Sequence, residues 1–290
     1  MRTSRERSNE IMRSWYQDAI HQPFALAHGD RNRAGALLVH GFTGSPADMR
    51  ALGEVVHARG LDVHVMRLPG MASEIDQLND MTAEIWRDAV LRQWAERRQR
   101  YERTVLVGYS MGGALSLLAA AEESPDLLML IAPLTRINDR RVPFLPVAKY
   151  VTRGVRPYAR LKWDDPRVHE WFDRTRPSMM TRDPEHQQVM EHEAIYSARM
   201  LDELRRLLVQ TRRSAPKVSS PTIILQGISD RIVLRRDTRE LVTRIGGPVT
   251  YREMPGDHYL PLPAFDGWSR LCPAIDGELR AWMEMNEVTP

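Results

Sequence analysis

The sequence predicts an α/β fold, in which a mostly parallel central sheet is flanked by helices and carries an inserted helical cap. Three observations support this prediction. Short apolar runs typical of buried strands alternate with longer segments that have apolar residues at helical spacing. One strand passes into a helix through Gly108-Tyr109-Ser110-Met111-Gly112. The alternation stops between residues 134 and 219 and then resumes, as expected for an insertion between two strands.

Bulk composition indicates a globular protein with a large core. The chain has 290 residues, of which 42% are hydrophobic and 27% charged. No apolar stretch reaches the roughly 18–20 residues that span a bilayer, and the charged start MRTSRERSNE lacks the apolar part of a secretory signal. Cys272 is the single cysteine, which excludes an internal disulfide and a cysteine metal cluster. We therefore expect a cytoplasmic protein without integral membrane association.

Charge patterning indicates an ordinary solvated surface. The net charge is +3, and arginines spread along the chain are matched by acids. There is no nucleic-acid-binding motif, so no nucleic-acid partner is expected. Met190-Glu191-His192-Glu193 with His186 nearby could suggest a metal site, but the H-E-x-x-H spacing is absent and a solvated helix face is the better interpretation.

Residues 1–133 are expected to form the first part of the core, with residues 1–22 as an N-terminal arm that is either a short helix or a loose segment. Ser45-Pro46 is typical of a helix start, and Gly60 of a helix end. The expected elements are a strand at 23–26, a strand at 36–39, a helix at 45–59, a strand at 63–68, a helix at 82–100, the strand–turn–helix of 104–121 and a strand at 127–131.

Residues 134–219 are expected to form a helical cap or lid, and residues 220–290 the second part of the core. The cap range holds a helical patch at 193–211 and several aromatic residues, which either line an acyl tunnel or pack the cap onto the core. Arg153, Arg156 and Arg160 could attract acidic substrates or a membrane surface, but a solvated surface is the better interpretation. The second part is expected to contain a strand at 222–225, a helix at 236–245, a strand at 249–254 and a helix at 274–285.

The turn around Ser110 can hold a serine hydroxyl at the edge of the sheet, on a sharp strand-to-helix bend. Gly108 and Gly112 have no side chain, so the strand and the helix can approach closely. Because a serine hydroxyl is a poor nucleophile at neutral pH, it needs a base, which is usually a histidine oriented by a carboxylate.

Enzymes with a serine on such a turn keep the chain order serine, acid, histidine. His258 follows the last expected strand, whereas the other histidines after Ser110 fall in the cap range, so His258 is the expected base. Asp230 follows the preceding strand and is the expected acid. Asp257 is the competitor, but it adjoins His258 and is the better candidate for a turn former.

An oxyanion intermediate needs two preorganised donors. The N–H of Met111, which follows the nucleophile, is one, and the N–H of Phe42, in the loop after an earlier strand, is the other. Gly41 lets that loop bend close to the serine. His40 lies before the serine in the chain, which favours a structural, loop-holding role over that of the base.

The runs LLVHGFTGS, GYSMGG, LQGISDRIV and MPGDHYL are together similar to bacterial carboxylesterases and monoacylglycerol lipases with the α/β-hydrolase fold. The resemblance extends from about Gly35 to the C-terminal helix and is weakest in the cap. It implies Ser110 as nucleophile, Asp230 and His258 as its partners, and Phe42 and Met111 as oxyanion donors. One departure is Pro69-Gly70-Met71-Ala72, where such enzymes usually carry Gly-His-Gly, which affects the expected pocket wall.

The resemblance implies a serine hydrolase that cleaves short or medium acyl esters, or monoacylglycerol-like lipids, through an acyl-enzyme, with no cofactor and no metal. Two alternatives stay open. The same triad could cleave a thioester, lactone, amide or carbon–carbon bond, or the fold could serve as a non-catalytic binding module. The partner is expected to be a small ester or lipid-like molecule, and the oligomeric state stays open.

Overall fold

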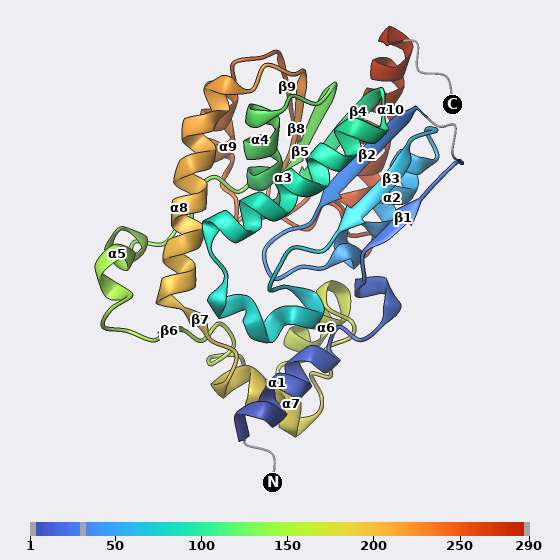
Figure 1. The fold of residues 1–290 in the computed structure, drawn as a ribbon. Helices are drawn as coiled ribbons and strands as arrows, with labels where there is room; N and C mark the ends of the chain where they lie inside the picture. Colours follow the sequence, from blue (N-terminus) through green and yellow to red (C-terminus); the bar gives the residue numbers. More distant parts are fainter. Residues whose placement is uncertain (1–3, 30–32, 287–290) are drawn as a thin grey trace.

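The computed structural model describes residues 4–29 and 33–286 and has a seven-stranded sheet at its centre (Figure 1). The edge strand β1 pairs antiparallel with β3, and every other neighbouring pair in this sheet is parallel. In spatial order the strands are β1 (Phe24–Leu26), β3 (Asp62–Met66), β2 (Ala34–Val39), β4 (Arg103–Tyr109), β5 (Leu127–Ile131), β8 (Thr222–Gly227) and β9 (Val249–Met254).

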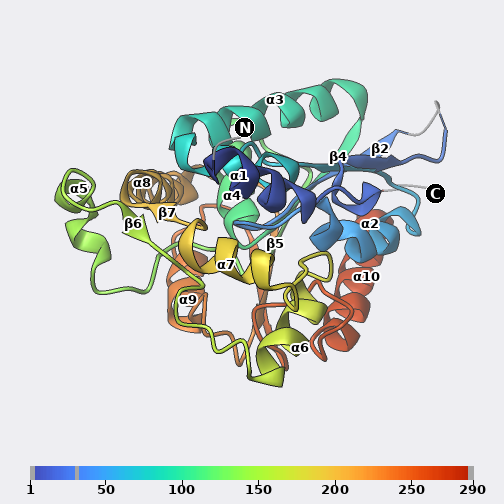
Figure 2. The same ribbon diagram turned by 90° about the horizontal axis from the view of Figure 1, so that it is seen from below.

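Helices cover both faces of the sheet, as a parallel sheet requires. On β2, Leu37 and Val39 face one apolar cluster, and Ala36 and Leu38 face another. The first face is covered by α3 (Ala83–Arg100), α4 (Met111–Glu122), α8 (Ala198–Ser214) and α9 (Arg235–Val242). The second face is covered by α2 (Arg50–His57) and α10 (Trp268–Met285) (Figure 2).

The predicted core elements are present, with shifts at their ends. The strands at 127–131 and 249–254 have the expected bounds. The expected helix at 45–59 is instead a 3₁₀ turn, η2 (Pro46–Met49), followed by α2, and Gly60 with φ 86° follows its end. Helix α10 begins six residues earlier than the expected residue 274, and Pro273 lies inside it.

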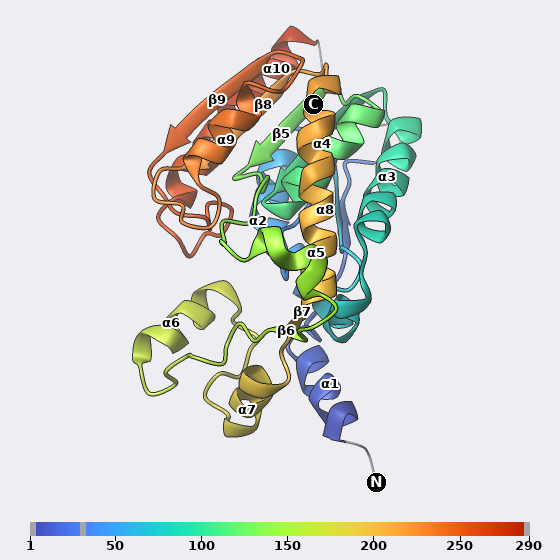
Figure 3. The same cartoon turned by 90° about the vertical axis from the view of Figure 1, so that its left-hand side faces the viewer.

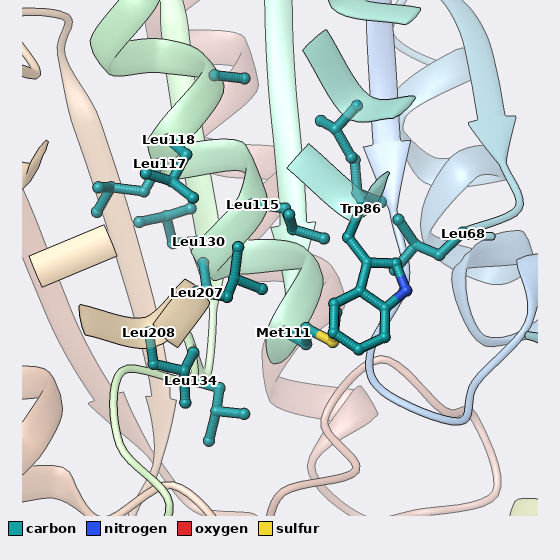
Figure 4. Packing of buried hydrophobic residues seen from close by; sticks show 14 of the residues in the cluster. Leu68, Trp86, Met111, Leu115, Leu117, Leu118, Leu130, Leu134, Leu207 and Leu208 are labelled. Carbon is teal, nitrogen blue, oxygen red and sulfur yellow. The ribbon is translucent and has the colours of Figure 1, made fainter. Parts of the chain in front are cut away.

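The patch expected to be helical from residue 193 begins as α8 only at Ala198. Ser197 is its N-cap, because the Ser197 side chain accepts a hydrogen bond from the Met200 N–H at 3.1 Å. Before it, β7 (Tyr196–Ser197) pairs with β6 (Gly154–Val155). Although α8 falls inside the range expected for the cap, its residues Leu207 and Leu208 belong to the core cluster and lie on the same side as Leu117, Leu130 and Leu134 (Figure 4).

The remaining part of the cap range lies beyond the carboxyl ends of the strands (Figure 3). It contains short helices, namely the 3₁₀ turn η4 (Val142–Phe144), α5 (Leu145–Ala148), α6 (Pro166–Thr175) and α7 (Pro184–His192). The 3₁₀ segment η3 (Ala72–Asp80) borders this part of the chain on the side of the core. The short 3₁₀ turn η5 (Ala215–Lys217) leads from α8 to β8.

The N-terminal arm is helical and belongs to the cap side of the molecule. Helix α1 (Ser4–Ser14) lies next to α7 and η3, and the 3₁₀ turn η1 (Ala19–His21) lies next to η2. Trp15 and Tyr16 are buried in a small apolar cluster with Phe172 of α6 and Met190 of α7. The aromatic side chains of this cluster therefore pack the arm and the cap together.

None of the helices in the described part of the chain combines the length and apolar character that crossing a bilayer requires.

Candidate active site

Ser110 lies on a strained bend between β4 and α4. Its backbone has φ 54° and ψ −117°, a conformation that costs free energy for a residue other than glycine and is concentrated at functional sites. The Ser110 N–H donates to the Ile131 carbonyl at 2.9 Å, and the Ser110 carbonyl accepts from Leu134 N–H at 2.9 Å. The neighbouring strand β5 and its loop therefore hold the bend from both sides.

Two glycines permit this bend because there is no room for a side chain. A Cβ atom at Gly112 would lie 2.1 Å from the Val39 carbonyl oxygen, and one at Gly108 would lie 2.5 Å from the Gly112 carbonyl oxygen. Both distances are impossible for real atoms, so β4 and α4 can meet in this way only with glycine at both positions.

Ser110, His258 and Asp230 form a continuous hydrogen-bonded chain. The His258 Nδ1–H donates to Asp230 Oδ2 at 2.8 Å, and His258 Nε2 lies 3.0 Å from Ser110 Oγ. Because the carboxylate can only accept, Nδ1 carries the proton and Nε2 is free to accept the serine proton. All three residues are buried, with 5–6% of each exposed. The residues come from the carboxyl-end loops after β4, β8 and β9.

The Asp230 carboxylate is fully engaged. Its Oδ1 accepts from the Ile232 and Val233 N–H groups, both at 2.8 Å, and its Oδ2 accepts from Gln226 Nε2 at 3.0 Å as well as from His258. Sequence reasoning missed Gln226, which the structure places behind the acid. The competitor Asp257 instead accepts from the Tyr259 N–H at 2.9 Å, as a turn-forming aspartate does.

Tyr109, the residue before the serine, holds the loop that carries the histidine. Its hydroxyl donates to the His258 carbonyl at 3.0 Å, and its ring lies 5.2 Å from the imidazole, centre to centre. Burial, followed by the nearby Asp48 carboxylate, raises the pKa of Tyr109 well above its ordinary value, so its hydroxyl keeps the proton that it donates. Sequence reasoning assigned this residue no role.

Of the two expected oxyanion donors, Met111 follows Ser110 in the chain, and Phe42 belongs to a loop that comes close to Ser110 in space. Met111 is the first residue of α4, and its side chain points into the core beside Trp86 (Figure 4). Phe42 is in the loop after β2, where a Cβ atom at Gly41 would lie 3.2 Å from the Cβ of Ser110. Within the described residues neither the Met111 nor the Phe42 N–H has a protein acceptor.

His40 ties the Phe42 loop to the chain after β3. Its Nε2 accepts from the Leu68 N–H at 3.1 Å, and its Nδ1–H donates to the Gly41 carbonyl at 2.9 Å. Both ring nitrogens are thus used in holding backbone. Burial lowers the pKa of His40 from 6.5 to about 4, so the ring is neutral at pH 7. Met71, in the segment that departs from the family pattern, is fully buried in the core.

The neutral, buried state of His40 predicts a loss of stability in mild acid. Between pH 6.5 and about 4 the unfolded chain protonates this histidine while the folded chain does not, so the free energy of unfolding falls as the pH falls through this window. The full effect is about 3 kcal/mol. Urea unfolding of wild type and His40→Gln across this range should show a shallower pH dependence for the variant. Equal slopes would contradict the assignment.

Arg176, at the end of α6 in the cap, makes an ion pair with the loop region that carries Phe42. Its Nη1 donates to Asp48 Oδ1 at 3.2 Å, and its Nη2 donates to the Thr43 carbonyl at 3.3 Å. The side chains of Arg176 and Asp48 are only 18% and 8% exposed. Burial alone would lower the pKa of Arg176, but the Asp48 carboxylate together with the nearby Tyr16, Tyr158 and Tyr259 outweighs burial, and the pKa is raised. Sequence reasoning missed this pair because nothing in the local pattern of either segment indicates it.

Removing the Arg176 contact should impair turnover more than substrate binding, because the Thr43 carbonyl, one residue from the Phe42 N–H, would lose a donor. We expect Arg176→Met combined with Asp48→Asn, which leaves no unpaired buried charge, to lower kcat by roughly 10–100-fold with little change in KM. Arg182→Met, which removes an exposed ion pair with Asp173 in the same cap, is the control and should retain wild-type kcat. A raised KM with unchanged kcat would instead assign Arg176 to substrate binding.

Among the described residues there is no group of three or more histidine, cysteine, aspartate or glutamate side chains that could hold a metal ion. His186, considered above as a possible ligand, accepts a hydrogen bond from Trp15 Nε1 at 2.8 Å.

Two known proteins are similar to this chain over about three quarters of its length. The chain is 28% identical to a thermostable monoacylglycerol lipase of Bacillus sp. (strain H-257) over 212 residues, which cover 73% of this chain and 75% of that one. It is 26% identical to a carboxylesterase of Bacillus subtilis (strain 168) over 214 residues, covering 73% and 77% of the two chains.

Solved structures show the same fold. A structure reported with the metagenome-derived lipolytic enzymes LipS and LipT superposes with a TM-score of 0.71 at 19% identity, covering 91% of this chain and 98% of that chain. The monoacylglycerol lipase of Paleococcus ferrophilus superposes with a TM-score of 0.62 at 17% identity, covering 90% and 99%. The fold of this chain is therefore the α/β-hydrolase fold.

The sequence profile of one family, described as serine aminopeptidase, S33, matches residues 30–256, which include Ser110 and Asp230 and end just before His258. The N-terminal arm with α1 lies outside the matched range. This match and the fold together show that the chain belongs to the serine aminopeptidase S33 family of α/β-hydrolase enzymes.

Proposed function

We propose that this protein cleaves carboxylic esters through a Ser110–His258–Asp230 triad and an acyl-enzyme. The observation that carries the proposal is the hydrogen-bonded chain from Asp230 through His258 to Ser110, buried at the carboxyl edge of the sheet. A serine so placed has a base to take its proton and a carboxylate to fix the tautomer of that base.

The proposed reaction follows from these contacts. Ser110 Oγ attacks the ester carbonyl while His258 Nε2 takes its proton, and Asp230 stabilises the imidazolium that forms. The Phe42 and Met111 N–H groups donate to the oxyanion. The alcohol leaves with the proton from His258, and a water molecule, activated by the same base, then releases the acid and restores Ser110.

The substrate class is supported by two relatives. The relatives named monoacylglycerol lipase and carboxylesterase each align with about three quarters of this chain. Short or medium acyl esters and monoacylglycerol-like lipids are therefore the proposed substrates. We also propose that the segment from residue 134 to the start of α8 acts as the cap over the site. The unpaired Cys272 fits a reducing compartment, and we place the enzyme in the cytoplasm.

A substrate panel tests the proposal. Purified protein should hydrolyse p-nitrophenyl esters, with a dependence on acyl length, and 1-monoacylglycerols, and a fluorophosphonate probe should label it. A parallel panel of thioesters, lactones and aminoacyl amides separates the other reactions that the same triad could perform. Preference for an aminoacyl amide would assign the reaction named in the family description and overturn the ester proposal. Absence of both labelling and turnover would favour a non-catalytic binding role.

A further inference from the structure

The cap carries a cluster of exposed apolar side chains on one short segment. Phe144, Val147, Tyr150 and Val151, which we call the α5 patch, are 69%, 72%, 78% and 83% exposed. They lie within eight residues of chain, on η4, α5 and the turn that follows. Single exposed apolar residues are ordinary on protein surfaces, but contiguous ones mark interaction sites.

The α5 patch is the outer face of an element that is already anchored on its inner face. Leu145 is buried, and Lys149, one helical turn later, makes an ion pair with Asp202 of α8 at 2.6 Å. Phe144, Val147 and Val151 are spaced by three and four residues and so share the opposite face. The orientation of the patch is thus fixed by α8, and it is not an unpacked end of the core.

The chain around the α5 patch is strongly basic. Residues 140–162 contain seven arginines and lysines and no aspartate or glutamate. Among the described residues, Arg140, Arg153, Arg156 and Arg160 have no carboxylate partner, and all four are exposed. Figures 1 and 2 show α5 standing out from the body of the molecule, beside α8. The segment therefore presents apolar side chains on a projecting part of the surface, with unpaired cations before and after them in the chain.

We propose that residues 140–162 dock this protein peripherally on an anionic lipid surface. Exposed aromatic and aliphatic side chains partition into the boundary between headgroups and acyl chains. Lysine and arginine beside them are attracted to anionic headgroups, and a segment without acids has no repulsion to offset this attraction. The apolar contacts and the electrostatic contacts therefore favour the same partner. The docking does not depend on ester hydrolysis, and it is distinct from spanning the membrane.

Vesicle binding measures this docking independently of catalysis. Wild-type protein is centrifuged with vesicles of equal parts phosphatidylglycerol and phosphatidylcholine, and with vesicles of phosphatidylcholine alone. We expect binding to the anionic vesicles that is at least roughly tenfold tighter than to the neutral ones, and that high salt weakens. Equal binding to both, or binding to neither, would overturn the proposal.

Two matched pairs of variants locate the surface. Phe144→Ser with Val151→Ser should weaken binding, whereas Met285→Ser, at an equally exposed apolar residue of α10, should not. Arg153→Glu with Arg156→Glu should weaken binding at least roughly tenfold, whereas Arg213→Glu with Lys217→Glu makes the same change of net charge at the far end of α8 and should not. If the controls weaken binding as much as the α5 variants, net charge and general hydrophobicity explain the binding and the proposal is wrong.

A fluorescent label tests insertion directly, and does not rely on variants that remove contacts. Because Cys272 is the single cysteine, Val151→Cys in a Cys272→Ser background accepts one environment-sensitive dye. We expect its emission to shift to the blue with anionic vesicles, and a dye at Arg213→Cys to show no shift. Light scattering of the unlabelled protein tests the remaining possibility, that a second copy of the chain covers the patch. A dimer that is lost in the variant Phe144→Ser with Val151→Ser would assign the patch to a second copy and overturn lipid docking.

Discussion

Replacing Ser110 by alanine is expected to lower kcat by about 10⁵–10⁶-fold, the size of effect seen when a triad nucleophile is removed. The hydroxyl lies 3.0 Å from His258 Nε2, and the nucleophilic mechanism has no substitute for it. The fold should be retained, because alanine is smaller and the positive φ at this position is imposed by β4, α4 and the contacts to Ile131 and Leu134.

The matched control for this variant lies on the same helix. Ser116 of α4 is also fully buried, and its hydroxyl has no hydrogen-bond partner within the described part of the chain. Ser116→Ala should therefore keep wild-type turnover and fluorophosphonate labelling. Labelling of Ser110→Ala at the wild-type rate, or loss of activity in Ser116→Ala alone, would place the nucleophile elsewhere.

Replacing Asp230 by asparagine is expected to lower kcat by about 10⁴-fold, as a carboxylate-to-amide change does in serine-protease triads. An asparagine amide can turn its NH₂ group toward His258 Nδ1, which then becomes an acceptor, and the ring proton moves to Nε2. That tautomer cannot take the proton of Ser110. Steady-state kinetics on the best ester of the panel measures the loss, and the urea midpoint separates it from unfolding.

Asp257→Asn distinguishes the two candidate acids. Since the acceptor role of the Asp257 side chain among the described residues is toward the Tyr259 N–H, and asparagine serves equally well in such a turn, this variant should stay within a fewfold of wild-type kcat. The reverse result, a near-wild-type Asp230→Asn and an inactive Asp257→Asn, would move the acid to Asp257 and require a rearranged His258 loop.

The core could be predicted from the sequence because local pattern and global fold agree there. Buried parallel strands appear as continuous apolar runs, and glycines flank the Ser110 bend where backbone approaches backbone. Residues that lie at the carboxyl ends of parallel strands must meet at one edge, so the order Ser110, Asp230, His258 was enough to expect their contact. Gln226 could have been anticipated as well, because it is a polar residue at the end of an apolar strand.

The cap could not be predicted in the same way, because its contacts join segments that are distant in sequence. Arg176 meets Asp48 across 128 residues, and Trp15 meets His186 across 171. No periodicity encodes such pairs. The start of α8 was wrong by five residues for a related reason: the apolar spacing of residues 193–197 also suits a helix, while the pairing of β7 with β6 determines the structure.

The separation of Trp15 and His186 along the sequence has a consequence for biosynthesis. The arm leaves the ribosome before the cap, and its hydrogen-bond partner is made 171 residues later, a delay of roughly 10–30 s at ordinary rates of translation. During that time Trp15 and Tyr16 are without the α6 and α7 side chains that bury them. The arm must therefore wait as an exposed apolar segment while strands β1 to β5 are made, and it can dock only after α7 has left the ribosome.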